Sequence, residues 1–164
     1  MRGVILAGGM GTRLLPATLI TNKHLLPVYK KLMIEYPLQT LLDLGIKDII
    51  IVSGGNNIGD FATVLGSGKK YNARFTYVVQ DEPLGIAHAV SLTYDFLNNE
   101  PFVVVLGDNY FEDNISTIVD TKQFNSGATV FLKEVPDPQR FGCPGIVNGK
   151  ISIVEEKPKE PKSN

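Results

Sequence analysis

The sequence predicts an α/β fold, with a Rossmann-like, mostly parallel sheet and helices on both of its faces. Short apolar runs alternate with amphipathic stretches along the 164 residues, as expected when helices connect the strands of a parallel sheet. Two expected strands, Asp48–Val52 and Phe102–Leu106, are continuously apolar rather than alternating, which is typical of central strands buried on both faces. A turn with three glycines in four positions directly follows the first apolar run.

The elements follow in a regular order. Apolar runs predict strands, and longer amphipathic stretches between them predict helices. Gly45 stands where a helix ending at Leu44 needs a residue of positive φ. The Asn148-Gly149 pair predicts a type I′ hairpin within Gly145–Glu155. The expected strands are Gly3–Leu6, Asp48–Val52, Arg74–Val79, Phe102–Leu106 and Ala128–Leu132, and the expected helices are Ile34–Leu44, Ile58–Leu65, Ile86–Leu97 and Ile115–Phe124.

Length and composition indicate one domain spanning residues 1–164, because no internal repeat or linker interrupts the pattern. A net charge of −1 gives no basic field for nucleic acid, and no apolar run reaches the ~20 residues that span a membrane. The single cysteine excludes an internal disulfide, and two histidines without a CxxC pair argue against structural zinc. With the first strand starting at residue 2 or 3, no signal peptide is expected, which indicates the cytoplasm.

The glycine-rich turn is the first candidate site. The strand delivers Leu6 and Ala7 into a loop that contains Gly8, Gly9, Gly11, Thr12 and Arg13, and exposed backbone amides beside a guanidinium suit phosphate. The alternative is a tight turn with a solvated arginine. Leu14 stands where a dinucleotide-binding loop has its third glycine, and the sequence has no Walker A motif, so both of those loops are excluded.

Lys23 follows in a proline-flanked loop, from which it could return to the same phosphates. A loop lysine is more often simply solvated. We expect the neighbouring His24 to pack or form a hydrogen bond rather than act as a base, because no carboxylate lies near it in sequence to orient it.

Two polar positions follow later strands. Gln80 can offer a paired donor and acceptor to a nucleobase, and Gly85 would let that base approach; a loop with acidic caps is an equally good interpretation. Asp108 ends the most apolar strand, where open α/β sheets bind ligands and where a carboxylate commonly holds Mg²⁺ between phosphates. It could instead cap the next segment.

Near the C-terminal end, Glu155, Glu156 and Lys157 could form a salt-bridged strand end, and the residues alone favour that interpretation. Cys143, next to Pro144, lacks the neighbouring base or cation of a nucleophile.

Taken in order, these segments resemble the sugar-1-phosphate nucleotidylyltransferases, and more specifically their thymidylyl branch. The likeness extends over essentially the whole chain and implies the family's nucleotide-diphospho-sugar transferase type of fold. The segments that carry it are Leu6–Leu14, Asn22–Pro27, Met33–Leu38, Gln80, Gly85–Ala87, Leu106–Asn109, Arg140–Gly142 and Glu155–Pro158. In some members glutamine stands at the position of His24.

The resemblance implies a Mg²⁺-dependent transfer from dTTP to glucose 1-phosphate that gives dTDP-glucose and pyrophosphate without a covalent enzyme intermediate. It assigns roles to matching residues. The nucleotide would be bound by Leu6, Ala7, Gly8, Gly9, Gly11, Thr12, Arg13, Gln80, Gly85 and Asp108. The catalytic residues would be Arg13, Lys23 and Lys157, and the metal ligand would be Asp108. The sugar phosphate would be bound by Gly142, Glu156 and Lys157.

The resemblance also sets alternatives. Family members continue beyond the segment that matches Pro161–Asn164 and carry a second metal-binding aspartate there, so we expect this chain to lack the family's C-terminal part. Three hypotheses follow: the enzyme described above, a non-catalytic nucleotide-binding module, and the same fold with UTP or another sugar phosphate. A homo-oligomer is compatible with all three.

Overall fold

The computed structural model describes residues 1–9, 11–119, 126–161 and 163. The chain divides into two compact units, Met1–Phe124 and Asn125–Asn164. The single domain expected from the sequence stays a prediction. In the parts of the chain that the structure describes, every helix is too short or too polar to cross a membrane.

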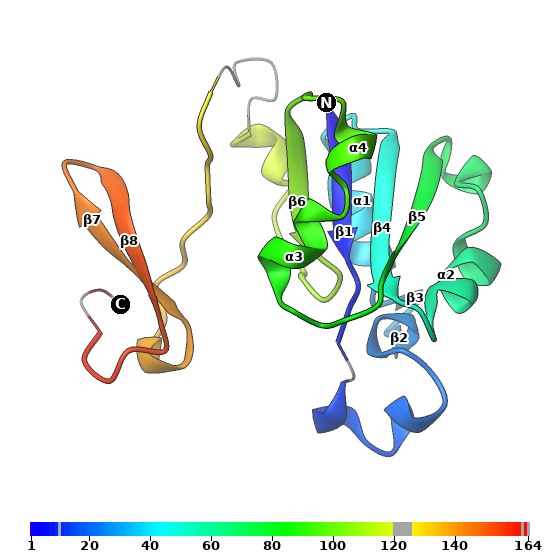
Figure 1. Cartoon of the computed structure of the whole chain (residues 1–164), viewed down its shortest axis with the longest axis horizontal. Coiled ribbons are helices and arrows are strands. Elements are labelled where there is room, and N and C mark those ends of the chain that lie inside the picture. The colour runs from blue at the N-terminus through cyan, green and yellow to red at the C-terminus, as the bar shows by residue number, and fades with distance from the viewer. Residues whose placement is uncertain (10, 120–125, 162, 164) are drawn as a thin grey trace. The chain divides into compact units, whose positions relative to one another are not determined.

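The first unit is built on a parallel four-stranded sheet in the order β5-β4-β1-β6 (Figure 1). The strands are β1 (Arg2–Leu6), β4 (Asp48–Gly54), β5 (Arg74–Gln80) and β6 (Phe102–Leu106). All four expected strands of this unit are confirmed within two residues at either end. From β1 the chain passes to β4 and then β5 on one side, and later to β6 on the other.

Helices cover both faces of this sheet, as the sequence predicts. Successive residues of β1 alternate between two apolar cores: Ile5 packs with α1 (Glu35–Asp43) and α2 (Ile58–Leu65), and Val4 packs with α3 (Ile86–Ser91) and α4 (Tyr94–Leu97). Figure 1 shows α3 and α4 in front of β1 and α1 behind it. The α/β fold class is therefore confirmed.

Two helix predictions agree with the structure closely. α2 has the expected bounds, and α1 lies within the expected range. Gly45 adopts φ 77°, and its amide donates to the carbonyl of Leu42 at 2.9 Å, so it ends α1 as a helix-terminating glycine does.

The helix expected over Ile86–Leu97 is divided into α3 and α4. The hydroxyls of Ser91 and Thr93 donate to the carbonyls of His88 and Val90 at 2.8 and 2.7 Å. Such local bonds compete with the backbone ladder of a helix, which explains the break.

Three sequence expectations fail, two of them in part and one of them completely. β6 is an edge strand in the described chain, with Phe102 and Val104 exposed, so it is not the central buried strand that its apolar run indicates. Ala128–Leu132 forms no strand, because no described strand pairs with it. In place of the helix Ile115–Phe124 there is a 3₁₀ turn at Ile115–Thr117, and residues 120–124 lie outside the described residues.

The second unit contains an antiparallel pair, β7 (Gly142–Val147) and β8 (Lys150–Glu156). Asn148 and Gly149 both have positive φ, 51° and 73°, which confirms the expected hairpin turn. The sequence did not predict the short pair β2 (Pro27–Val28) and β3 (Lys31–Leu32), nor 3₁₀ turns at Thr12–Leu14, Ala17–Leu19, Lys23–Leu25, Lys69–Tyr71 and Pro138–Arg140.

Candidate active site

The carboxyl ends of the parallel strands bring the first candidate residues to one edge of the sheet. Gly8 follows β1, Gln80 ends β5, and Asp108 follows β6. β1 is the strand at which the strand order reverses, and ligands of open α/β sheets bind outside the carboxyl ends of the strands at such a point.

The glycine-rich loop leaves β1 from a fixed base. Ala7 is buried, its amide donates to the carbonyl of Val52 at 2.8 Å, and its own carbonyl accepts from the Ser53 hydroxyl at 3.0 Å. Beyond this base, Gly9 and Gly11 adopt φ of 95° and 61°, a conformation that favours glycine. The loop therefore turns sharply where the sequence predicts a phosphate site, although Met10 lies outside the described residues.

Gly11 is also required for space. A Cβ on it would lie 2.9 Å from Cγ2 of Thr18 and 3.1 Å from Cβ of Lys23, and the Thr18 hydroxyl donates to the Gly11 carbonyl at 2.9 Å. The loop is thus packed against the segment that carries Lys23. Thr12 and Arg13 follow in an exposed 3₁₀ turn, and Arg13 has no ion-pair partner among the residues described.

Lys23 and Asp108, separated by 85 residues in sequence, form an ion pair. The Lys23 Nζ lies 2.5 Å from Oδ2 of Asp108, whose side chain is 39% exposed. Burial acts to raise the pKa of Asp108, but the hydrogen bond and the charge of Lys23 outweigh it and hold this pKa below its usual value. A cation and an ionised carboxylate therefore stand together at this sheet edge.

Asn22 and His24 anchor the Lys23 turn beneath the ion pair. Both side chains are almost fully buried, at 4% and 1% exposure. Asn22 Oδ1 accepts from the backbone amide of His24 at 2.9 Å and lies 2.7 Å from His24 Nδ1. The expectation that His24 packs and hydrogen-bonds agrees with this geometry.

Burial, with a smaller contribution from the charge of Lys23, lowers the pKa of His24 from 6.5 to about 4. The ring is therefore neutral near pH 7. It lies against Gly107, where a Cβ would come within 2.7 Å of His24 Cδ2, and so it fills the space left by that glycine.

Gln80 lies beside the glycine-rich loop. Its side chain is 8% exposed, and a Cβ on Gly8 would lie 3.3 Å from Gln80 Oε1. Gln80 Nε2 donates to the carbonyl of Gly85 at 3.4 Å and lies 3.1 Å from Nδ1 of His88. Gly85 itself adopts φ 100° and begins α3 with open space where a side chain would stand.

The second unit brings its own three predicted residues together. Gly142 pairs with Glu156 across β7 and β8, and a Cβ on Gly142 would lie 3.4 Å from Glu156 Oε2. Lys157 follows, with its Nζ 3.5 Å from Glu156 Oε1 and its amide donating to the carbonyl of Phe141 at 2.9 Å. A carboxylate and an exposed cation therefore stand at the end of this hairpin.

Asp108 is the candidate metal ligand. In the described part of the chain, no group of three or more His, Cys, Asp or Glu side chains is placed to hold a metal. A single exposed carboxylate still suits Mg²⁺, which commonly keeps several waters and binds one or two carboxylates together with substrate phosphates.

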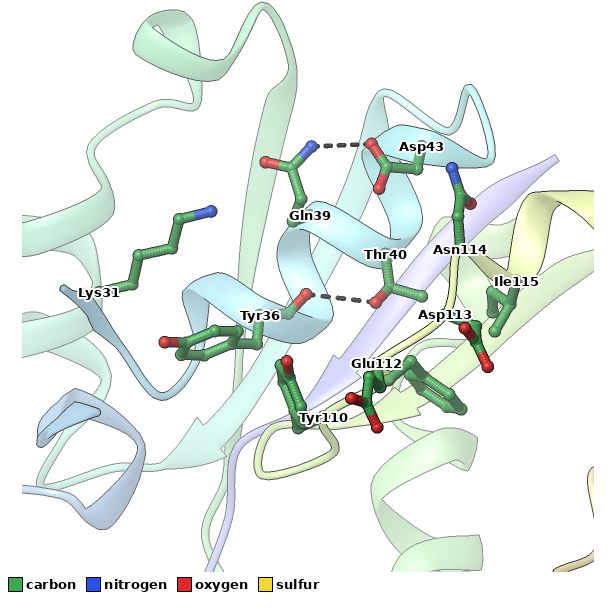
Figure 2. A pocket seen from close by; sticks show the side chains of 11 residues that line it. Lys31, Tyr36, Gln39, Thr40, Asp43, Tyr110, Glu112, Asp113, Asn114 and Ile115 are labelled. Atoms are coloured by element: carbon green, nitrogen blue, oxygen red, sulfur yellow. Dashed lines mark hydrogen bonds between the residues drawn. The ribbon is translucent and has the colours of Figure 1, made fainter. Parts of the chain in front are cut away.

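A separate pocket of about 160 Å³ lies beside α1, between it and the segment after β6 (Figure 2). Tyr36 and Tyr110 meet there edge to face, with ring centroids 5.2 Å apart. None of the site residues predicted from the sequence lines this pocket.

Sequence reasoning assigned no role to Asn22, Ser53 or His88. Asn22 and Ser53 bond to the backbone that leads into the loop, and His88 contacts Gln80. The available signal was the position of His88 one helical turn beyond Gly85, which directs its side chain back toward the end of β5.

The family model described as nucleotidyl transferase matches residues 2–164. The chain is 41% identical over 167 residues to glucose-1-phosphate thymidylyltransferase of Neisseria meningitidis serogroup A, and 42% identical over 166 residues to the enzyme of that name from Xanthomonas campestris pv. campestris. These alignments cover 100% and 99% of this chain but 58% and 56% of the relatives. The chain thus spans little more than half the length of these relatives.

Among solved structures, one described as a glucose-1-phosphate thymidylyltransferase of Bacillus anthracis in complex with sucrose matches with a TM-score of 0.92 and 50% identity. The match covers 99% of this chain and 67% of that one. UDP-glucose pyrophosphorylase of Acinetobacter baumannii matches with a TM-score of 0.75 at 23% identity, over 96% of this chain and 68% of that one, which shows a shared fold.

Proposed function

The chain belongs to the nucleotidyl transferase family, and we propose that it serves nucleotidyl transfer from dTTP to glucose 1-phosphate, with dTDP-glucose and pyrophosphate as products. The observation that carries the proposal is the meeting of the glycine-rich loop, Gln80 and the Lys23–Asp108 pair at one edge of the sheet. Relatives named glucose-1-phosphate thymidylyltransferase support the choice of substrates.

In the proposed reaction, a phosphate oxygen of glucose 1-phosphate attacks the α-phosphorus of dTTP. The bond from the α-phosphorus to the bridging oxygen breaks, and pyrophosphate leaves with that electron pair. Such transfers depend on positioning and on stabilising charge rather than on a covalent enzyme intermediate. This chemistry needs cations and amide donors around the phosphates, which are the groups that this chain offers.

Each predicted site residue of the first unit has a role in this proposal. The amides of Gly8, Gly9 and Gly11 bind the triphosphate, while Arg13 and Lys23 balance the charge that develops on the phosphates. Gln80 and Gly85 receive the pyrimidine base. Leu6, Ala7 and Thr12 complete the set that binds the nucleotide, and Ala7 is also the hydrogen-bonded base of the loop.

Asp108 is the residue that would hold Mg²⁺, which would draw charge from the phosphate oxygens when bound. Its exposed carboxylate and its pKa below the usual value, set by Lys23 against the opposing effect of burial, fit this role. In the second unit, Gly142 and Glu156 would contact the sugar, and Lys157 would bind its phosphate as a compact charge. We further propose that the reaction takes place in the cytoplasm.

UTP is the second candidate nucleotide. Thymine and uracil offer the same hydrogen-bonding edge to Gln80 and differ by one methyl group, which is worth only about 1–3 kcal/mol in a hydrophobic pocket. Direct competition between dTTP and UTP tests which is preferred.

The proposed activity is tested by pyrophosphate release from dTTP and glucose 1-phosphate in the presence of Mg²⁺. We expect release to need both substrates and to fall roughly 100-fold or more in Asp108→Ala, because the carboxylate that holds the metal is removed. Asp60→Ala, which removes an exposed carboxylate from α2, serves as the control and should keep full activity.

The absence of release, or equal release by Asp108→Ala, would contradict this proposal. Calorimetric binding of dTTP without any turnover would instead support the non-catalytic nucleotide-binding module.

A further inference from the structure

The orientation of the Gln80 carboxamide is fixed by its neighbours. The Gly85 carbonyl, 3.4 Å away, can only accept a hydrogen bond, so the nitrogen of the amide must face it. The oxygen then points to the other side, toward Gly8, where a Cβ would lie 3.3 Å from it.

His88 completes the arrangement. Its Nδ1 lies 3.1 Å from the same Gln80 nitrogen, which is a donor, so Nδ1 must carry a lone pair and accept. Both N–H groups of the carboxamide are then directed to protein acceptors, Gly85 O and His88 Nδ1. Gln80 is left with its oxygen as the group available to a ligand.

We propose that His88 is a positioning residue that holds the Gln80 carboxamide with its oxygen toward the nucleobase. This inference rests on the proposed function and deepens it. A base is accepted when it presents an N–H at the contacted position, as N3 of thymine and uracil does. Cytosine presents a lone pair at N3, which would face the oxygen of Gln80 and leave both acceptors unpaired.

The proposal explains why a histidine rather than an apolar residue is useful at this place. Without an acceptor at position 88, only the long 3.4 Å contact with Gly85 holds the carboxamide, so the turned orientation, which presents its NH₂ group to the base, costs less free energy. A turned carboxamide suits cytosine. The role of His88 is therefore exclusion of the wrong base more than affinity for the right one.

The test compares the dissociation constants of dTTP and dCTP, each with Mg²⁺, for the full chain, three single variants, and the double variant that combines His88→Phe with Gln80→Leu. His88→Phe removes the acceptor. His88→Asn keeps an oxygen at the place of Nδ1, and Gln80→Leu removes the carboxamide. Thermal unfolding of each variant reports on folding, and the ratio of the two dissociation constants reports on base selection.

We expect the unaltered chain to prefer dTTP, His88→Phe to lose about tenfold of that preference, and His88→Asn to keep most of it. In the Gln80→Leu background, His88→Phe should change the ratio no further, because His88 acts through Gln80. A residue that only supports the fold would change both dissociation constants together.

An unchanged ratio in His88→Phe, an equal loss in His88→Asn, or an additive double variant would overturn the role of His88 while leaving the proposed function standing. Failure of the unaltered chain to bind dTTP would overturn the proposed function and this inference together.

Discussion

At the scale of single residues, the Lys23–Asp108 pair sets the charge at the sheet edge. The loop packing around Gly11 holds Lys23 in place, and Asp108 is carried by the end of β6. The pair thus joins the Lys23 turn, which packs on the glycine-rich loop, to the end of β6, the neighbour of β1. It places opposite charges where the proposed reaction needs both a cation for phosphate and a carboxylate for metal.

Lys23→Met should raise the pKa of Asp108 in metal-free protein. Burial already acts to raise this pKa, and the variant removes the hydrogen bond and charge that oppose burial. Titration of the carboxyl carbon by NMR measures the change. Lys30→Met, which removes a lysine that lies over Tyr29 instead, should leave the pKa of Asp108 where it was; equal pKa values in both variants would contradict the account.

The neutral, buried ring of His24 predicts a loss of stability in mild acid. Its folded pKa of about 4 lies below the unfolded value of 6.5, so between these values the unfolded chain binds a proton that the folded chain does not. Stability therefore falls as pH decreases through this window. From pH 7.5 to 5.5 the loss from this group is roughly 1.4 kcal/mol.

The measurement is the free energy of unfolding by urea at the two pH values. His24→Gln, which cannot be protonated, is the matched variant and should lack this part of the pH dependence. An equal decrease in the free energy of unfolding of both proteins between pH 7.5 and 5.5 would show that His24 does not cause the loss of stability.

At the scale of elements, the contact between β6 and the Lys23 turn depends on Gly107. Its amide donates to the carbonyl of Leu6 at 2.8 Å, and a Cβ there would come within 3.1 Å of that oxygen as well as against the His24 ring. Neither the backbone nor the buried ring can move aside cheaply.

Gly107→Ala should therefore destabilise the chain by about 1–3 kcal/mol, the usual range for overpacking. Gly59→Ala in α2 is the control, because a Cβ there meets nothing within 4 Å, and it should be neutral or add up to about 1 kcal/mol of stability through helix propensity. Urea unfolding of both variants decides the matter. Equal stabilities would mean that the space beside Gly107 is less constrained than the contacts indicate.

The elements also show what sequence patterns can and cannot predict. β1, β4 and α2 follow from local apolar patterns and turn residues, because each buries the face that its pattern marks. Ala128–Leu132 has the composition of a strand but no described strand to pair with, and pairing is a property of the whole chain. The break between α3 and α4 arises from two hydroxyls whose local bonds no apolar pattern encodes.

The residues of the candidate site, too, could be predicted from the sequence only in part. The rule that ligands bind at the carboxyl ends of strands predicts the place of Asp108, which follows β6. That Gly8 and Gln80 lie at the same edge follows from the strand order, which the structure shows. The contact of His88 with Gln80 and the anchoring of His24 by Asn22 depend on side-chain directions, which the sequence does not specify.

At the scale of the whole molecule, the proposed roles are divided between the two compact units. The nucleotide-binding residues all belong to Met1–Phe124, and the residues for the sugar phosphate belong to Asn125–Asn164. Each group is assembled within its own unit, the second by the register of β7 and β8.

This division predicts that the Michaelis constants of the two substrates can be changed separately. Gln80→Leu should raise KM for dTTP about tenfold and leave KM for glucose 1-phosphate within about twofold, since one hydrogen-bonding contact is lost on one substrate. Lys157→Met should do the reverse. Steady-state kinetics with each substrate varied in turn measures both constants, and a variant that raises both equally would contradict the division.

The most direct test of the account is to map where dTTP with Mg²⁺ binds by NMR chemical-shift perturbation of the full chain. We predict that the largest changes fall on the amides of Gly8, Gly9 and Gly11, the side-chain amide of Gln80, and the amides of Gly85 and Asp108. Changes confined to the pocket around Tyr36 and Tyr110, with the glycine-rich loop unaffected, would contradict the claim that the sheet edge is the nucleotide site.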